Sequence, residues 1–136
     1  MAVAPPRPRD LPLNGLRAFE AAARLRVPAD LVGETCLTDA SWAGDWAIWA
    51  AAAGMAGFAP RGPVFSLYAL ALAEAAGGAG VLIGHGSLVA VHIAWGEVVA
   101  PFGQRVVLPG GLRLWSARHL RAGSAVGRMA GFLRGV

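Results

Sequence analysis

The repeated order of short apolar runs and alanine-rich segments constrains the fold of this chain more than any other feature. From residue 28 onward, four of the five runs with the character of a strand are followed by a longer segment with the character of a helix. Gly80–Gly84 shows no polar alternation, which is typical of a strand covered on both faces of a parallel sheet. The order strand then helix, repeated along the chain, predicts an α/β class with a mainly parallel sheet.

Glycine, serine and proline positions set the expected bounds of these elements. An amphipathic helix capped by Asn14 is expected to end before Pro28. The expected strands are residues 35–38, 62–65, 80–84, 97–100 and 112–117. The other expected helices are a single turn at 28–31 and the segments 42–54, 66–76, 87–94 and 124–133, with Ser66 and Ser87 as N-caps.

The composition excludes an intrinsically disordered chain, because 56% of the 136 residues are hydrophobic and only 15% are charged. A mean hydropathy of +0.53 raises the question of a membrane span, for which Val64–Ile83 is the best candidate. Glu74 lies in the middle of that segment, and glycines interrupt it, so a helix followed by a buried strand is the preferred interpretation. A small membrane-associated protein that spans through residues 64–83 stays open as the alternative.

The charge of the chain comes from arginine alone, since none of its 12 basic residues is lysine. Six arginines follow Glu97 without any acidic residue. Contact with nucleic acid is one interpretation of this basic end, and solvated helix faces are the other, favoured because blocks of like charge are absent. Cys36 is the sole cysteine, which excludes an intramolecular disulfide, and its apolar neighbours predict a buried thiol.

The sequence offers little support for an enzyme. His85, His92 and His119 lack ligand spacing with one another or with Cys36, so no metal site is expected. The glycines of 77–80 precede a strand, whereas a phosphate-binding loop follows a strand and opens a helix. No catalytic residue and no cofactor are therefore expected.

Trp42, Trp46 and Trp49 are spaced as one stripe on a helix, which predicts core packing, with an aromatic ligand platform as the alternative. Trp95, near the end of the expected helix 87–94, is predicted to be partly exposed.

Two stretches of the chain resemble LysR-type transcriptional regulators of the glycine-cleavage-activator-like branch. Residues 11–25, LPLNGLRAFEAAARL, are similar to the first helix of the winged helix-turn-helix domain in that branch. The rest resembles the latter part of the effector-binding domain. Its matching stretches are PADL at 28–31, WAGDWAIWAAAAG at 42–54, RGPVFS at 61–66, LALAEAAGGAGVLIG at 70–84 and LVAVHIAWGEVVAPFG at 88–103.

The resemblance implies a division of the chain into three parts. Residues 1–12 are expected to be a disordered leader, 13–26 the remnant of the first helix, and 27–136 a partial effector-binding domain. That domain is expected to have part of a type 2 periplasmic-binding-protein-like fold. The recognition helix, the dimerisation helix and the first effector lobe of the family have no counterpart here, so the resemblance implies an internally deleted, cytoplasmic regulator.

The resemblance also implies partners and site residues. A small effector, carboxylate or amino-acid-like, is expected in a cleft at the strand ends, where Phe65 and Ser66 are the candidate contacts. The alternative for Ser66 is that it only caps its helix. Arg7, Arg9 and Arg17 are candidates for contact with the DNA backbone.

Sequence-specific DNA binding is expected only of the intact family form, because base reading belongs to the recognition helix. Association with a second copy or with an intact relative is expected, and no membrane partner. A stand-alone small-molecule-binding module stays open as a further alternative.

Overall fold

The computed structural model describes residues 20, 22–108, 115, 119, 121 and 123–135 of the chain. These residues belong to two compact units, Met1–Val106 and Val107–Val136. The described elements of the first unit are the 3-10 helices η2 (Pro28–Gly33) and η3 (Ala40–Trp42), the strands β1 (Cys36–Asp39), β2 (Val64–Phe65) and β3 (Val81–Leu82), and the helices α2 (Asp45–Ala52), α3 (Tyr68–Ala76) and α4 (Gly86–Ala94). The second unit contains α5 (Ala125–Arg134).

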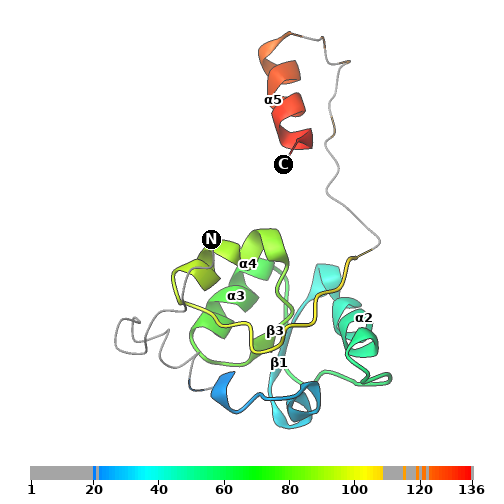
Figure 1. Cartoon of the computed structure of the whole chain (residues 1–136), viewed down its shortest axis with the longest axis vertical. Helices are drawn as coiled ribbons and strands as arrows, with labels where there is room; N and C mark the ends of the chain where they lie inside the picture. The colour runs from blue at the N-terminus through cyan, green and yellow to red at the C-terminus, as the bar shows by residue number, and fades with distance from the viewer. Residues whose placement is uncertain are drawn as a thin grey trace. The chain divides into compact units, whose positions relative to one another are not determined.

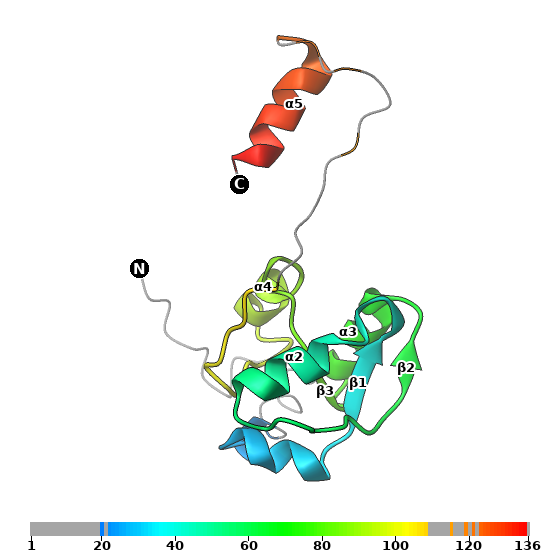
Figure 2. The same cartoon turned by 90° about the vertical axis from the view of Figure 1, so that its right-hand side faces the viewer.

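The sheet of the first unit is parallel, as the sequence predicts, and its strand order is β2-β1-β3. In register, Cys36 pairs with Val81 on one side of β1, and Thr38 pairs with Val64 on the other. The connections β1 to β2 and β2 to β3 run in opposite directions across the sheet. Because strand–helix–strand connections are right-handed, their helices must lie on opposite faces. Figures 1 and 2 show α2 on one face and α3 on the other.

A cluster of buried apolar side chains fills the α2 face of the sheet. Its members are Leu25, Leu31, Cys36 and Trp46. Trp46 is only 2% exposed, and its indole nitrogen donates a hydrogen bond to the carbonyl oxygen of Leu37 at 3.1 Å. The predicted burial of Cys36 is confirmed, and burial raises the pKa of its thiol. We call this set the core cluster.

The opposite face of the sheet is covered by α3. Because successive strand residues point to opposite faces, Leu37 follows Cys36 on β1 but faces away from the core cluster. Leu37 is buried, as are Ala71 and Leu72 of α3 and Val89 of α4. These four side chains form a second buried apolar layer, between β1 and the helices on the α3 side of the sheet.

Glycines end the helices of the first unit, as the sequence predicts for α2 and α3. Gly54, Gly78 and Gly96 all have positive φ, at 79°, 84° and 72°. At α4, the amide of Gly96 donates to Ile93 and the amide of Glu97 donates to His92, which is the Schellman arrangement.

The same arrangement explains why the expected strand at 97–100 is wrong. The amides of Glu97 and Val98 both donate to the carbonyl oxygen of His92, at 2.9 and 3.4 Å. The helix end thus uses the donors that a sheet ladder would need, and residues 97–100 form no strand.

Two expected N-caps are also wrong. Leu67 is extended, at φ −135° and ψ 133°, so α3 begins at Tyr68 and Ser66 does not cap it. His85 is likewise extended, so α4 begins at Gly86 and Ser87 lies inside the helix. Tyr68 and His85, whose hydrogen bonds lie at these two helix starts, belong to the site described in the next subsection.

The segment Val64–Ile83, considered above as a membrane span, is divided between β2, α3 and β3. No helix in the described part of the chain is long and apolar enough to cross a membrane. The segment therefore does not form the single helix that the alternative of a span requires.

In the second unit, the predicted terminal helix is confirmed. Ser124 precedes α5, and its hydroxyl oxygen accepts a hydrogen bond from the amide of Gly127 at 3.0 Å. The strand expected at 112–117 lies outside the described residues apart from Trp115.

The expected leader 1–12 and most of the first helix also lie outside the described residues. Glu20, Ala22 and Ala23 are helical. Leu25, two residues after Ala23, belongs to the core cluster. The end of this segment is therefore attached to the α/β core.

Candidate ligand site at the carboxyl edge of the sheet

The parallel strands of the first unit bring three chain segments together at their carboxyl ends. β1 ends at Asp39, β2 ends at Phe65, and the chain that leaves β3 continues through Ile83 to His85. From β1 the chain proceeds to α2, whereas from β3 it proceeds to α4, which Figure 1 shows on the side of α3. In open α/β sheets, ligands bind outside the carboxyl ends of strands whose connections diverge in this way.

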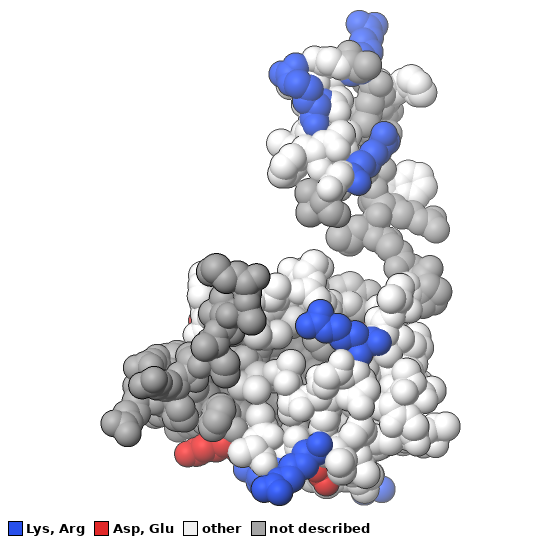
Figure 3. Space-filling model, viewed as in Figure 1, with Lys and Arg blue, Asp and Glu red and all other residues white. Residues whose placement is uncertain are grey.

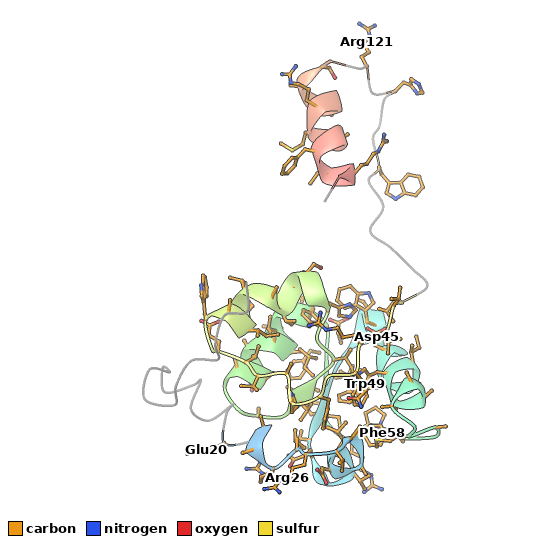
Figure 4. All side chains as sticks on the ribbon, in the orientation of Figure 1. Glu20, Arg26, Asp45, Trp49, Phe58 and Arg121 are labelled. Carbon is orange, nitrogen blue, oxygen red and sulfur yellow. The ribbon has the colours of Figure 1, made fainter. Side chains whose placement is uncertain are left out.

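A small hollow lies at this edge, between the ends of β1 and β3. Thr38 and Trp46 contribute to its wall, and the remaining polar and aromatic side chains that line it are those of Asp39, Trp42, Asp45, Tyr68 and His85. The open space at its centre is about the size of a water molecule. In Figure 4 the labelled Asp45 lies at this edge, whereas the labelled Trp49 and Phe58 lie further toward the other end of β1. We call these five residues the edge cluster.

His85 and Asp45 form the closest polar contact of the edge cluster. Nε2 of His85 lies 2.7 Å from Oδ2 of Asp45, and both side chains are mostly buried. The contact is not aligned as a hydrogen bond, so among the described residues this buried carboxylate oxygen accepts none. The Trp42 ring lies against the imidazole, with 4.0 Å between the ring centroids and 38° between the planes. His85 is therefore held between an indole face and a carboxylate.

Tyr68 connects the start of α3 to the chain after β3. Its hydroxyl donates to the carbonyl oxygen of Ile83 and accepts from the amide of His85, both at 3.1 Å. Burial raises the pKa of Tyr68, and the nearby negative charges of Asp39 and Asp45 raise it further. The amide of His85, which donates to the hydroxyl, opposes this rise. Tyr68 is therefore a neutral group at ordinary pH and fixes both helix starts.

The charges at the hollow are negative. Asp39 is 6% exposed and Asp45 is 9% exposed. Oδ1 of Asp39 accepts from the amide of Ser41 at 2.8 Å and so caps η3, while Asp45 occupies the first turn of α2, where the helix dipole favours an anion. None of the described lining residues is an arginine. The edge thus contains two buried carboxylates without an arginine, and His85 is the basic residue among the described lining.

The two residues predicted to contact an effector lie at the same edge but outside the hollow. Phe65 is half-buried and pairs in register with Asp39. Ser66 follows it and is exposed. Neither lines the hollow. Arg7, Arg9 and Arg17, predicted to contact DNA, lie outside the described residues.

The tryptophan stripe is confirmed in part. Trp46 is in the core cluster, and Trp49 packs against it and against Phe102. Trp42 lies in η3 rather than in the following helix, is 39% exposed and lines the hollow, so its assignment to the core is wrong. Trp95 is exposed, as predicted.

Sequence reasoning missed most of the edge cluster. Ligand spacing bears only on metal binding and carries no information on the contact of His85 with Asp45. The position of these residues along the chain is the signal that could have indicated the site. Asp39 lies at the end of β1, and His85 directly follows the expected strand 80–84. Chemistry-bearing residues at the ends of predicted parallel strands converge, whatever their sequence separation.

The chain is similar to a solved structure, the effector domain of the transcriptional regulator AmpR of Pseudomonas aeruginosa, a LysR-type regulator. The sequence identity is 33% and the TM-score is 0.57, over 62% of this chain and 40% of that chain. This chain thus spans less than half the length of that domain. No protein-family model and no curated protein matches the sequence. The likeness and the parallel sheet confirm the expected α/β, periplasmic-binding-protein-like class. The chain has the fold of part of a LysR-type effector domain.

Proposed function

We propose that this chain is a small-molecule-binding unit of the LysR effector-domain type, with its ligand at the carboxyl edge of the sheet. The observation that carries the proposal is the edge cluster, where buried polar side chains and exposed aromatic surface converge at strand ends. Binding sites are typically apolar or aromatic surfaces with a few convergent polar groups. Phe65 and Ser66 border the proposed site on the β2 side.

The proposal assigns the chain to transcription regulation in the cytoplasm, as part of a regulator rather than as an enzyme. The likeness to a LysR-type effector domain supports this assignment. Autonomous recognition of an operator is not proposed, because the resemblance includes no recognition helix. The described arginines of the second unit, Arg121, Arg128 and Arg134, are separate from one another in Figure 3 and form no continuous basic patch there. Association with a second copy or an intact relative completes the proposal.

A thermal-shift screen of the full chain tests ligand binding. The library contains carboxylates, amino acids and amines of up to about ten heavy atoms. A ligand at one hundred times its Kd stabilises the folded state by about 2.7 kcal/mol. For a unit of this size, that stabilisation raises Tm by roughly 10 to 20 °C. A complete library that leaves Tm unchanged contradicts the proposal.

Gel retardation tests the statement about DNA. At physiological salt, the purified chain is expected to retard a promoter fragment no more than an unrelated fragment of equal length. Lowering the salt is expected to increase any retardation of both fragments alike, because phosphate contacts carry no sequence information. Selective retardation of one fragment would contradict the proposal.

A further inference from the structure

The edge cluster contains two buried carboxylates, and the basic group that the described part of the chain places beside them is the imidazole of His85, 2.7 Å from Asp45. Asp39 and Asp45 are both nine-tenths buried or more, and both line the hollow. The described ion pair that includes an arginine joins Arg24 to Glu34, away from this edge. Carboxylates are rarely buried without a cationic or hydrogen-bonding partner, because desolvation of the charge is costly. Two such groups at one hollow therefore favour a positively charged occupant.

The contacts of the two carboxylates leave an acceptor free. Asp39 uses Oδ1 to cap η3. Oδ2 of Asp45 is buried and accepts no aligned hydrogen bond, although Nε2 of His85 is 2.7 Å away. A buried acceptor without a donor costs free energy that an incoming N–H group would recover. A hydrogen bond from a ligand to Oδ2 of Asp45 would therefore contribute more binding free energy than a bond to an exposed acceptor.

Aromatic faces complete the surroundings of that atom. Trp42 and Tyr68 both line the hollow, with their ring centroids 5.4 Å apart and the rings nearly edge to face. Trp42 retains an exposed fraction of 39%. A cation near the face of an indole is attracted by the ring's quadrupole, and ammonium groups are recognised in this way. The carboxylates and the aromatic rings of the hollow therefore both favour a positively charged ligand group.

We propose that the hollow binds the ammonium group of an amine ligand, with Asp45 as the hydrogen-bond acceptor, Asp39 as the second negative charge and Trp42 as the aromatic wall. This inference rests on the proposed function and specifies the chemistry of its ligand. An amino-acid-like ligand would present its amino group here. A simple carboxylate, which the family resemblance also allows, is excluded from the hollow by charge repulsion.

The test is a titration of the uniformly 15N-labelled full chain, monitored by NMR at the indole N–H groups. The probes are n-propylammonium chloride and sodium propionate at matched ionic strength, with sodium chloride as the reference. Trp42→Phe identifies the Trp42 resonance. Probes this small bind weakly even in good sites, so the expected range is millimolar. Propylammonium is expected to shift the Trp42 indole resonance saturably, and propionate to bind at least about tenfold more weakly.

Variants separate the hollow from general attraction by negative charge. Asp45→Asn keeps the size of the side chain and is expected to weaken propylammonium at least about tenfold. Asp39→Asn should weaken it less and should fold normally, because asparagine caps helices as well as aspartate does. Glu74→Gln removes an exposed carboxylate of α3 outside the hollow and is expected to leave the affinity unchanged. Equal losses in Asp45→Asn and Glu74→Gln would overturn the inference.

The outcomes also distinguish this inference from the proposed function. If propionate shifts the Trp42 resonance and propylammonium does not, the inference is overturned while ligand binding at the edge stands. If neither ion shifts it but a library compound raises Tm, the inference is again overturned alone. If no probe and no library compound acts on the chain, both are overturned.

Discussion

The two ends of β1 have opposite surroundings. At its start, Cys36 lies in the core cluster, where apolar side chains of the chain pack against one another. At its end, Asp39 lies in the edge cluster, where polar groups are buried and one carboxylate oxygen accepts no aligned hydrogen bond. The difference teaches that a strand of four residues serves two purposes. Its start stabilises the fold, and its end belongs to the site proposed to bind a ligand.

This comparison makes a general prediction about substitutions. Changes in the core cluster should lower the free energy of unfolding, because they remove buried apolar contacts. Changes at the edge should alter ligand binding with smaller effects on stability. The predictions below test this division in order of decreasing expected effect.

Trp46→Ala should have the largest effect on the core cluster. It removes a fully buried indole and its hydrogen bond to Leu37, and should lower the free energy of unfolding by about 3 to 5 kcal/mol. Urea denaturation followed by circular dichroism measures the loss. Ile48→Ala, on the same helix but 40% exposed, is the matched control and should cost about 1 kcal/mol or less. Equal losses in the two variants would remove the distinction between core and surface on α2.

Gly80→Ala should weaken the pairing of β1 and β3. A Cβ atom on Gly80 would collide with the backbone carbonyl of Thr35, which accepts the hydrogen bond from the amide of Val81. The expected cost is about 1 to 3 kcal/mol in the free energy of unfolding. Gly86→Ala is the control, because its Cβ meets open space in the first turn of α4. A Gly80→Ala protein as stable as Gly86→Ala would show that the strands do not approach this closely.

The sequence predicts the strands better than the helix starts. Apolar runs predict the positions of β1, β2 and β3, although Val64 of β2 is 65% exposed, and the terminal helix α5 is predicted close to its observed bounds. Ser66 and Ser87 fail as caps although they are suitable residues. The starts of α3 and α4 are set instead by contacts of Tyr68 and His85 with residues distant in sequence.

The candidate site was unpredictable for the same reason. The contact of Asp45 with His85 depends on how α2 and β3 pack, and no local pattern encodes it. The family resemblance placed Phe65 and Ser66 at the end of a strand. In the structure they lie at the same edge as the hollow, which they do not line.

Tyr68→Phe tests the contact between the edge cluster and the helix starts. It removes a hydroxyl that bridges Ile83 and His85, and should lower the free energy of unfolding by about 1 to 2 kcal/mol. Denaturation of the variant beside the wild-type chain measures the difference. A loss as large as that of Trp46→Ala would contradict the division between the two ends of β1.

The titration of Tyr68 provides a pH test of the same contact. Its pKa is raised in the folded state, so the folded chain retains this proton at pH values where the unfolded chain releases it. Stability should therefore fall as the pH rises above about 10, and less so in Tyr68→Phe. Because Tyr68 is the sole tyrosine, the ultraviolet absorbance of tyrosinate reports it alone. A midpoint equal to that of the urea-unfolded chain would contradict its burial.

Ser66→Ala and Ser124→Ala should have the smallest effects and should differ from each other. Ser124→Ala removes the cap of α5 and should destabilise that helix by about 1 kcal/mol. Ser66→Ala should change stability by less than about 0.5 kcal/mol, because Ser66 is exposed and caps no helix. Hydrogen exchange of the respective helices measures both effects. A larger loss in Ser66→Ala would restore the capping role that the structure excludes.

Hydrogen–deuterium exchange of the chain with and without a ligand from the thermal-shift screen tests the central claim most directly. Ligand should slow exchange in residues 39–45, 65–68 and 83–87, which form the carboxyl edge, and should leave α5 and the segment before β1 unchanged. Protection confined to α5 or to the start of β1 would contradict a ligand site at the carboxyl edge of the sheet.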